Sequence, residues 1–204
     1  MTDPLEHFYY KQLENPAEKT LFLLHGTGGD EDDFLFLNDE LEQSYNIVSL
    51  RGNVDEAGMK RFFKRLEHGV FDQESIIDET KKLKEFVEAY AKEQQVDPKS
   101  FVFFGYSNGA NMILATLFYY PELFHNVALL HPMLPFEPKQ KLDLKHLKAY
   151  VSYGLHDQLM TVEESQNVLK VLDDAGATIE AEVYNAGHEL TQEEMEDVIA
   201  CLKK

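Results

Sequence analysis

A serine lies between two glycines in the stretch "GYSNG", residues 105–109, where a strand-like run gives way to a helical pattern. A turn that only joins a strand to a helix needs no hydroxyl. Glycine at both flanking positions indicates that backbones pass so closely there that any Cβ would collide. The G-x-S-x-G spacing in this context is typical of a strained turn that exposes its serine hydroxyl. We therefore predict that Ser107 is a nucleophile.

A serine needs a base, and the base needs a group that orients it. Asp157 follows the strand-like run "YVSYG", and His188 follows the last such run, "TIEAEVYNAG". The order serine, acid, histidine predicts a triad in which Asp157 orients the imidazole of His188 and that ring takes the proton of Ser107. Other aspartates fit less well because they lie in a connection or at a helix end: Asp143, Asp173 and Asp174. His25 is expected to shape its own loop, and the remaining histidines, His131 among them, follow no pattern that predicts a role.

Acyl transfer also needs N–H donors aimed at the developing oxyanion. The backbone N–H of Asn108 is one candidate, because it begins the helix after the serine. The second is expected from the glycine-rich loop "HGTGGD", where we choose Thr27, with Gly28 as its neighbouring alternative. A phosphate site at this loop is a weak reading, since neither GK[ST] nor G-x-G-x-x-G is present.

The elements that must position these residues alternate between strand and helix, which predicts an α/β fold with a mostly parallel central sheet and helices on both faces. An edge strand or hairpin is expected near "HFYYKQ". Further strands are expected over 20–26, 45–52, 101–104, 126–132, 148–154 and 178–187, and helices over 30–43, 74–95, 108–119 and 162–175. Capping boxes, Thr161 with Glu164 and Thr191 with Glu194, mark the last two helices. We expect a single domain over 1–204.

Residues 51–75 form a long connection that carries several aromatic side chains. We consider that Phe62 and Phe63 wall a substrate pocket, with Arg51 beside it, and weigh this equally against simple packing of the loop. Five basic residues gather in this segment, and they read either as a solvated helix face or as a positive rim of a binding site: Arg51, Lys60, Arg61, Lys64 and Arg65.

The chain carries 19 basic and 37 acidic residues, a net charge of −18. Such a charge disfavours nucleic acid and anionic membranes as partners. No metal-binding motif or ligand cluster is evident, so no cofactor or metal is expected. Cys201 is the only cysteine, and neither a signal peptide nor a membrane-length apolar run is visible, so we expect a cytoplasmic protein with no stable membrane association.

The motifs "LLHGTGGDE", "LRGN", "FFGYSNGANMILA", "GLHDQLM" and "NAGHEL" together resemble the carboxylesterase/phospholipase/thioesterase branch of the α/β-hydrolases. The resemblance extends from about residue 18 to the end, and "RGNVDEAGMKRFFKRLEHGVFD" is similar to small bacterial carboxylesterases, some associated with quinone and hydroquinone stress. It implies a triad of Ser107, Asp157 and His188 and an oxyanion hole at Thr27 and Asn108. The turn reads "SNGA" where the branch commonly has glutamine after the serine, and the extra glycine in "GTGGD" is also atypical.

The leading functional prediction is a serine esterase for short or medium esters, since the connection between the strands at 126–132 and 148–154 is too short for a lid domain. An acyl-thioesterase, an acyltransferase or a cofactor-free perhydrolase would use the same residues. A non-catalytic binding module on the same fold is the alternative from another class. A small-molecule ester is the expected partner, and the sequence leaves a monomer and a homodimer equally open.

Overall fold

The computed structural model describes residues 3–67 and 69–204 of the chain, and its central element is a seven-stranded sheet with the order β1-β3-β2-β8-β9-β10-β11. Only β1 pairs antiparallel, with β3; the other neighbours are parallel. The strands are β1 Tyr10–Leu13, β2 Lys19–Leu24, β3 Tyr45–Leu50, β8 Val102–Tyr106, β9 Asn126–Leu130, β10 Lys148–Gly154 and β11 Thr178–Tyr184. The predicted α/β architecture with a mostly parallel sheet is confirmed.

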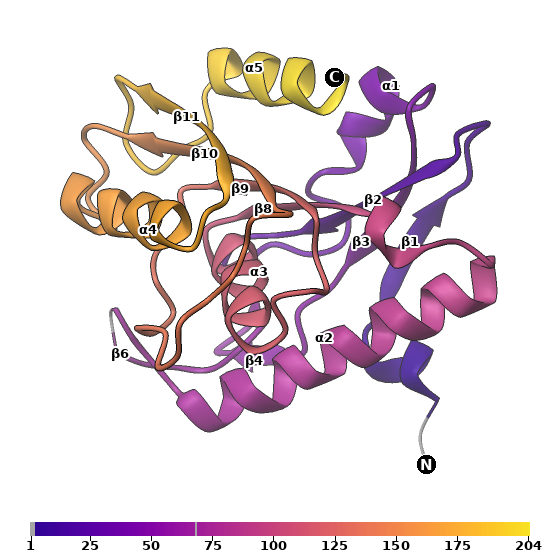
Figure 1. Ribbon diagram of the computed structural model, residues 1–204, viewed down its shortest axis with the longest axis horizontal. Coiled ribbons are helices and arrows are strands. Elements are labelled where there is room, and N and C mark those ends of the chain that lie inside the picture. Colours follow the sequence, from indigo (N-terminus) through magenta and orange to yellow (C-terminus); the bar gives the residue numbers. More distant parts are fainter. Residues whose placement is uncertain (1–2, 68) are drawn as a thin grey trace.

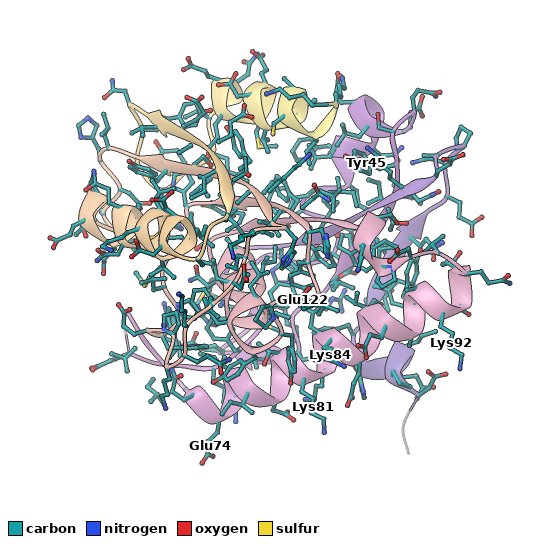
Figure 2. The ribbon with its side chains drawn as sticks, in the orientation of Figure 1. Tyr45, Glu74, Lys81, Lys84, Lys92 and Glu122 are labelled. Carbon is teal, nitrogen blue, oxygen red and sulfur yellow. The ribbon has the colours of Figure 1, made fainter. Side chains whose placement is uncertain are left out.

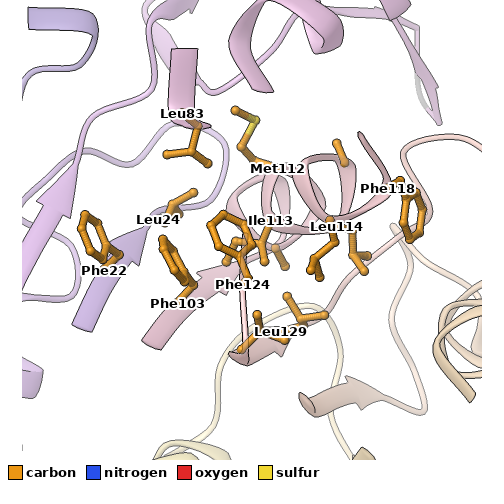
Figure 3. Close-up of a cluster of buried hydrophobic side chains, with 14 of the residues drawn as sticks. Phe22, Leu24, Leu83, Phe103, Met112, Ile113, Leu114, Phe118, Phe124 and Leu129 are labelled. Carbon is orange, nitrogen blue, oxygen red and sulfur yellow. The ribbon is translucent and has the colours of Figure 1, made fainter. Parts of the chain in front are cut away.

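Side chains alternate across the central strands and fill two separate cores. On β2, Phe22 and Leu24 belong to one core, while Leu21 and Leu23 belong to the other. All four are fully buried, as expected for a parallel sheet covered on both faces. Figure 3 shows part of the first core, with Phe22 and Phe103 on strands β2 and β8, and Met112, Ile113 and Leu114 on the helix Asn108–Tyr119.

Helices cover both faces of the sheet (Figure 1). The five helices of the described residues are α1 Asn38–Leu41, α2 Gln73–Gln94, α3 Asn108–Tyr119, α4 Val162–Asp174 and α5 Gln192–Leu202. Residues of α2, α3 and α4 pack in the first core, and residues of α1 and α5 in the second. Charged side chains occupy the outer side of α2, where Glu74, Lys81 and Lys92 extend away from the sheet (Figure 2). Within the described residues, no helix is both long and apolar enough to cross a membrane.

Two segments differ from the expected structure. Instead of one helix over 30–43, the chain forms turns, a 3₁₀ turn Leu35–Leu37 and the single-turn α1. Glu31 accounts for part of this, because its buried carboxylate accepts two hydrogen bonds from the guanidinium of Arg51. The connection 51–75, where the sequence predicts no strand, contains two small hairpins: β4 Val54–Glu56 with β5 Met59–Arg61, and β6 Arg65–Glu67 with β7 Val70–Phe71.

The helix starts follow the sequence signals with one exception. Thr161 and Glu164 form the predicted capping box of α4. At α5, Thr191 accepts the expected hydrogen bond from the backbone N–H of Glu194. The Glu194 carboxylate, however, turns into the protein instead of back to the helix end. The second capping box is therefore only half formed, and the buried carboxylate becomes available to the site described next.

Candidate active site

The turn between β8 and α3 holds Ser107 in a conformation that few residues adopt, with φ 52° and ψ −113°. Its N–H donates to the carbonyl of Leu130 at the end of β9, which anchors the turn. A Cβ at Gly105 would lie 2.7 Å from the backbone N of Ala110, and one at Gly109 would lie 2.2 Å from the carbonyl oxygen of Leu24. Both glycines are therefore required by close backbone approach, as the motif predicts.

The three residues predicted to act together lie within hydrogen-bonding distance. His188 Nε2 is 2.9 Å from Ser107 Oγ, and His188 Nδ1 is 2.6 Å from Asp157 Oδ2. The other oxygen of Asp157 accepts hydrogen bonds from the N–H groups of Leu159 and Met160. The Asp157 side chain is 1% exposed and that of His188 is 18% exposed. The acid is thus shielded, while the imidazole borders the solvent side of the site.

Tyr106 fixes the loop that carries His188. The Tyr106 hydroxyl donates to the carbonyl oxygen of His188 over 2.7 Å, and the two rings lie 5.4 Å apart. Burial, followed by the nearby carboxylates of Asp157 and Glu194, raises the pKa of Tyr106 to about 12. The phenol therefore remains a neutral donor, and the imidazole is held facing Ser107.

A second histidine, His131, lies behind the acid and is completely buried. Its Nδ1 is 3.1 Å from Asp157 Oδ2, and its Nε2 is 3.2 Å from Glu194 Oε2. Glu194 also accepts a hydrogen bond of 2.6 Å from the Ser152 hydroxyl. Asp157 therefore has an imidazole on each side. Burial would raise the pKa of Asp157, but the hydrogen bonds from His188 and His131 outweigh it and lower that pKa below its usual value, which keeps the carboxylate ionised.

The two predicted oxyanion donors lie beside the serine turn. A Cβ at Gly26 would lie 3.6 Å from Ser107 Cβ, which brings the loop containing Thr27 next to the serine. Asn108 is the first residue of α3. Among the described residues, neither the Thr27 N–H nor the Asn108 N–H has a hydrogen-bond partner. Both are therefore available to a ligand.

His25 shapes the Thr27 loop, as expected. Its Nε2 accepts a hydrogen bond from the Gly52 N–H, so its Nδ1 carries the proton and donates to the carbonyl of Gly26. Burial lowers the pKa of His25, in agreement with a neutral ring that accepts from a backbone N–H. The ring ties the Thr27 loop to the end of β3.

A cavity of about 340 Å³ opens over Ser107 and His188. Its wall includes neither of the two phenylalanines proposed for it, because Phe62 and Phe63 are fully buried in the first core. Arg51 is not part of the wall either, since it pairs with Glu31 and covers the Tyr9 ring. The pocket-lining assignment of these three residues is therefore corrected. The side chains that line the cavity apart from the serine turn and His188 include Met59, Arg61, Arg65, Phe71, Met133, Leu159 and Met160.

The family of the chain follows from its similarity to known proteins. A family model described as Phospholipase/Carboxylesterase matches residues 6–204. The chain belongs to the phospholipase/carboxylesterase family. This confirms the resemblance that the sequence motifs indicate, and membership makes the protein a carboxylesterase-type hydrolase.

Individual proteins are similar to this phospholipase/carboxylesterase-family chain over almost its whole length. MhqD of Bacillus subtilis, whose name gives hydrolase activity as an inference, is 38% identical over 192 residues, which cover 94% of each protein. The crystal structure of a Bacillus cereus carboxylesterase is 35% identical, with a TM-score of 0.92 and 99% of each chain covered. A Mesorhizobium loti carboxylesterase structure is 27% identical, with a TM-score of 0.89 and coverage of 97% and 95%. The predicted α/β-hydrolase fold is thereby confirmed.

Two groups of three side chains in the described part of this carboxylesterase-family chain could share a metal ion: Glu122, His125 and His146, and His131, Asp157 and His188. The hydrogen bonds around Asp157 account for the second group without an ion. The first lies outside the cavity over Ser107.

Several residues of the site carried no readable signal in the sequence. His131 follows β9 without a motif, and Glu194 was readable only as a helix-capping residue. Of the five basic residues in 51–75, only Arg61 and Arg65 line the cavity. They lie at strand ends of the hairpins, so the helix-face reading of this cluster is wrong.

Proposed function

We propose that the protein is a serine carboxylesterase that hydrolyses short or medium esters through an acyl-enzyme. The observation that carries the proposal is the continuous series Ser107 Oγ, His188 Nε2, His188 Nδ1 and Asp157 Oδ2, with separations of 2.9 and 2.6 Å. Nucleophile, base and orienting acid each have the partner that this chemistry needs.

In the acylation step, Ser107 Oγ attacks the ester carbonyl carbon while its proton passes to His188 Nε2. The Nδ1–H of His188 donates to Asp157, which stabilises the imidazolium that forms. The oxyanion accepts hydrogen bonds from the Thr27 and Asn108 N–H groups; a single such donor is worth about 2.7–4 kcal/mol in other enzymes. Collapse of the intermediate expels the alcohol, which takes the proton from Nε2.

Deacylation repeats these steps with water as the nucleophile. His188 Nε2 accepts a proton from the water, the hydroxide adds to the acyl carbon, and Ser107 leaves with the proton returned by the imidazole. The carboxylic acid is released and the free serine is restored. Apart from the ester and one water molecule, these steps balance their protons with Ser107 and His188.

The cavity supports small substrates. Its volume of about 340 Å³ lies near the lower end of the range of ligand pockets. Residues 131–147, which join β9 to β10, contain no helix or strand that could form a lid domain. A short or medium acyl chain fits this setting better than a long lipid chain.

Replacement of the serine tests the proposal. Ser107→Ala is expected to lower kcat for a short p-nitrophenyl ester by a factor on the order of 10⁶, because the nucleophile of the acyl-enzyme is lost. Ser44→Ala, which changes a serine outside the cavity, is the matched control and should retain the wild-type rate. Turnover of Ser107→Ala at more than a few per cent of the wild-type rate would exclude this mechanism.

A further inference from the structure

The charge of the cavity wall is opposite to that of the protein. The chain has a net charge of −18. Yet among the described residues the cavity over Ser107 is lined by Arg61 and Arg65 and by no aspartate or glutamate. Two cations without a lining carboxylate form a local positive field in a site that is partly shielded from water, where electrostatic interactions are stronger than in bulk solvent.

Arg61 is held in place before any ligand arrives. Its side chain is 3% exposed, its Nη1 donates to Thr27 Oγ1 over 2.5 Å, and its Nε donates to the carbonyl of Phe63. The backbone on either side is also tied to the site, because the Gly28 N–H donates to the carbonyl of Lys60 and the Phe62 N–H donates to Asn108 Oδ1.

The backbone of Arg61 also packs tightly against Gly52, where an added Cβ would lie 2.4 Å from the Arg61 carbonyl. A guanidinium fixed in this way loses little conformational entropy when it binds a ligand.

The nearby acid, Glu56, does not neutralise the pair. Its carboxylate accepts hydrogen bonds of 3.4 Å from Arg65 Nε and Nη2 and lies 3.4 Å from Arg61 Nε, and all three contacts are longer than a usual charge-assisted hydrogen bond. One carboxylate also faces two guanidinium groups. Burial, followed by repulsion from Arg65, lowers the pKa of Arg61, with Glu56 acting in the opposite direction. Among the described residues, two guanidinium groups facing this one carboxylate leave a net positive charge in the cluster.

We propose that the cavity binds esters that carry an anionic group, a carboxylate or a phosphate, held by Arg61 and Arg65 while the ester carbonyl faces Ser107. This proposal rests on the esterase function above and assigns it a substrate class. The planar guanidinium fork pairs with both anions in the same way. The rest of the lining is apolar, with Met59, Phe71 and Met133 in the wall, and suits the hydrocarbon part of such an ester.

A pair of matched esters tests this substrate class. p-Nitrophenyl hexanoate is neutral, and p-nitrophenyl hydrogen adipate replaces its terminal methyl group by a carboxylate; a third ester carries a phosphonate at the same place. The wild-type protein is expected to have a higher kcat/KM for an anionic ester than for the neutral one. The ratio of the two values cancels losses in folding or in the triad, because these affect both esters alike.

The arginine variants locate the effect. Arg65→Gln and Arg61→Gln should each lower the anionic-to-neutral ratio by about tenfold to a hundredfold, the range that one hydrogen bond to a charged group is worth. Arg61→Lys, which keeps the charge, should restore part of the ratio. Lys64→Gln removes one positive charge from an exposed side chain between the hairpins, outside the cavity, and should leave the ratio as in the wild type.

Two results would overturn the proposal without touching the esterase function. One is wild-type turnover of the neutral ester at Ser107 with a ratio at or below one. The other is a preference for the anionic ester that both arginine variants retain. Absence of turnover of all three esters by folded wild-type protein would overturn the esterase function itself, and the substrate class with it.

Discussion

Two buried carboxylates share His131, since its Nδ1 faces Asp157 and its Nε2 faces Glu194. Ionised carboxylates only accept hydrogen bonds, so a ring that lies between two of them is paired at both nitrogens when it is protonated. The other titratable groups around it include the rings of Tyr106 and His188, at 5.9 and 5.2 Å, and the Glu189 carboxylate, with which its charge interacts. Burial lowers the pKa of His131, but the hydrogen bonds and charges of Glu194 and Asp157 outweigh it and raise the pKa overall.

The stability of the protein is therefore expected to depend on the proton of His131. The folded state holds this proton more tightly than the unfolded chain, whose histidines titrate at about pH 6.5. The stabilisation is complete below that pH and is lost as the pH rises through the folded pKa. His131→Asn should lower the free energy of unfolding by about 3 kcal/mol at pH 6 and by less at higher pH.

Urea unfolding of the wild type and His131→Asn between pH 6 and 9 measures this difference. His156→Asn, at an exposed position, is the control and should follow the wild type. A free-energy difference between wild type and His131→Asn that stays constant with pH would show that folding does not raise the pKa of His131.

At the residue scale, Ser107, Asp157 and His188 could be predicted to meet because each follows the end of a strand. Parallel strands end at the same edge of the sheet, so sequence order alone brings these residues near each other. His131 could not be predicted in this way. Its meaning depends on Glu194, a residue of α5 that the sequence assigns to a helix cap. For Phe62 and Phe63 the sequence leaves a pocket wall and packing of the loop equally open, because an aromatic residue in a long connection reads alike whether it faces a cavity or the core; the structure shows packing in the core.

At the element scale, the serine turn depends on how closely α3 approaches β2. Gly109→Ala would place a Cβ 2.2 Å from the Leu24 carbonyl oxygen, and because the obstacle is buried backbone it cannot move away cheaply. We expect a loss of about 3 kcal/mol or more in the free energy of unfolding, together with a loss of esterase activity as Ser107 is displaced.

Gly58→Ala separates steric clash from backbone strain. Gly58 has φ 88° with no heavy atom within 4 Å of an added Cβ, so alanine costs only the positive-φ penalty of about 1 kcal/mol. Thermal or urea unfolding of both variants compares the two. If Gly109→Ala is no less stable than Gly58→Ala, the close approach of helix and strand does not govern the turn.

Regular strands and helices were predictable because their apolar patterns repeat over many residues, as in α2 and β8. The segments 30–43 and 51–75 were not. The first is acidic and helix-like in composition, but the buried pair of Glu31 with Arg51 is a contact between distant positions. The second contains hairpins of two or three residues per strand, too short for a periodic signal. Tertiary contacts decide the structure of both.

At the scale of the whole molecule, the site is assembled at one edge of the sheet. Ser107 follows β8, Asp157 follows β10, His188 follows β11 and Thr27 follows β2, so residues that follow the carboxyl ends of four strands of one sheet form the site. The acidic net charge of the chain does not predict the positive lining of the cavity over Ser107, because net charge averages over a surface. The basic residues of 51–75 offer a positive rim as one of two interpretations, and folding brings two of them, Arg61 and Arg65, to the cavity wall.

The central claim, that Ser107 is a nucleophile activated by His188, is tested most directly by covalent labelling. The wild-type protein is treated with a fluorophosphonate and its mass is measured intact and after digestion. We expect one adduct per chain on the peptide that contains Ser107, no adduct in Ser107→Ala, and labelling of His188→Ala slowed by about a thousandfold or more. An unlabelled wild-type protein, a label on another residue, or His188→Ala labelled at the wild-type rate would contradict it.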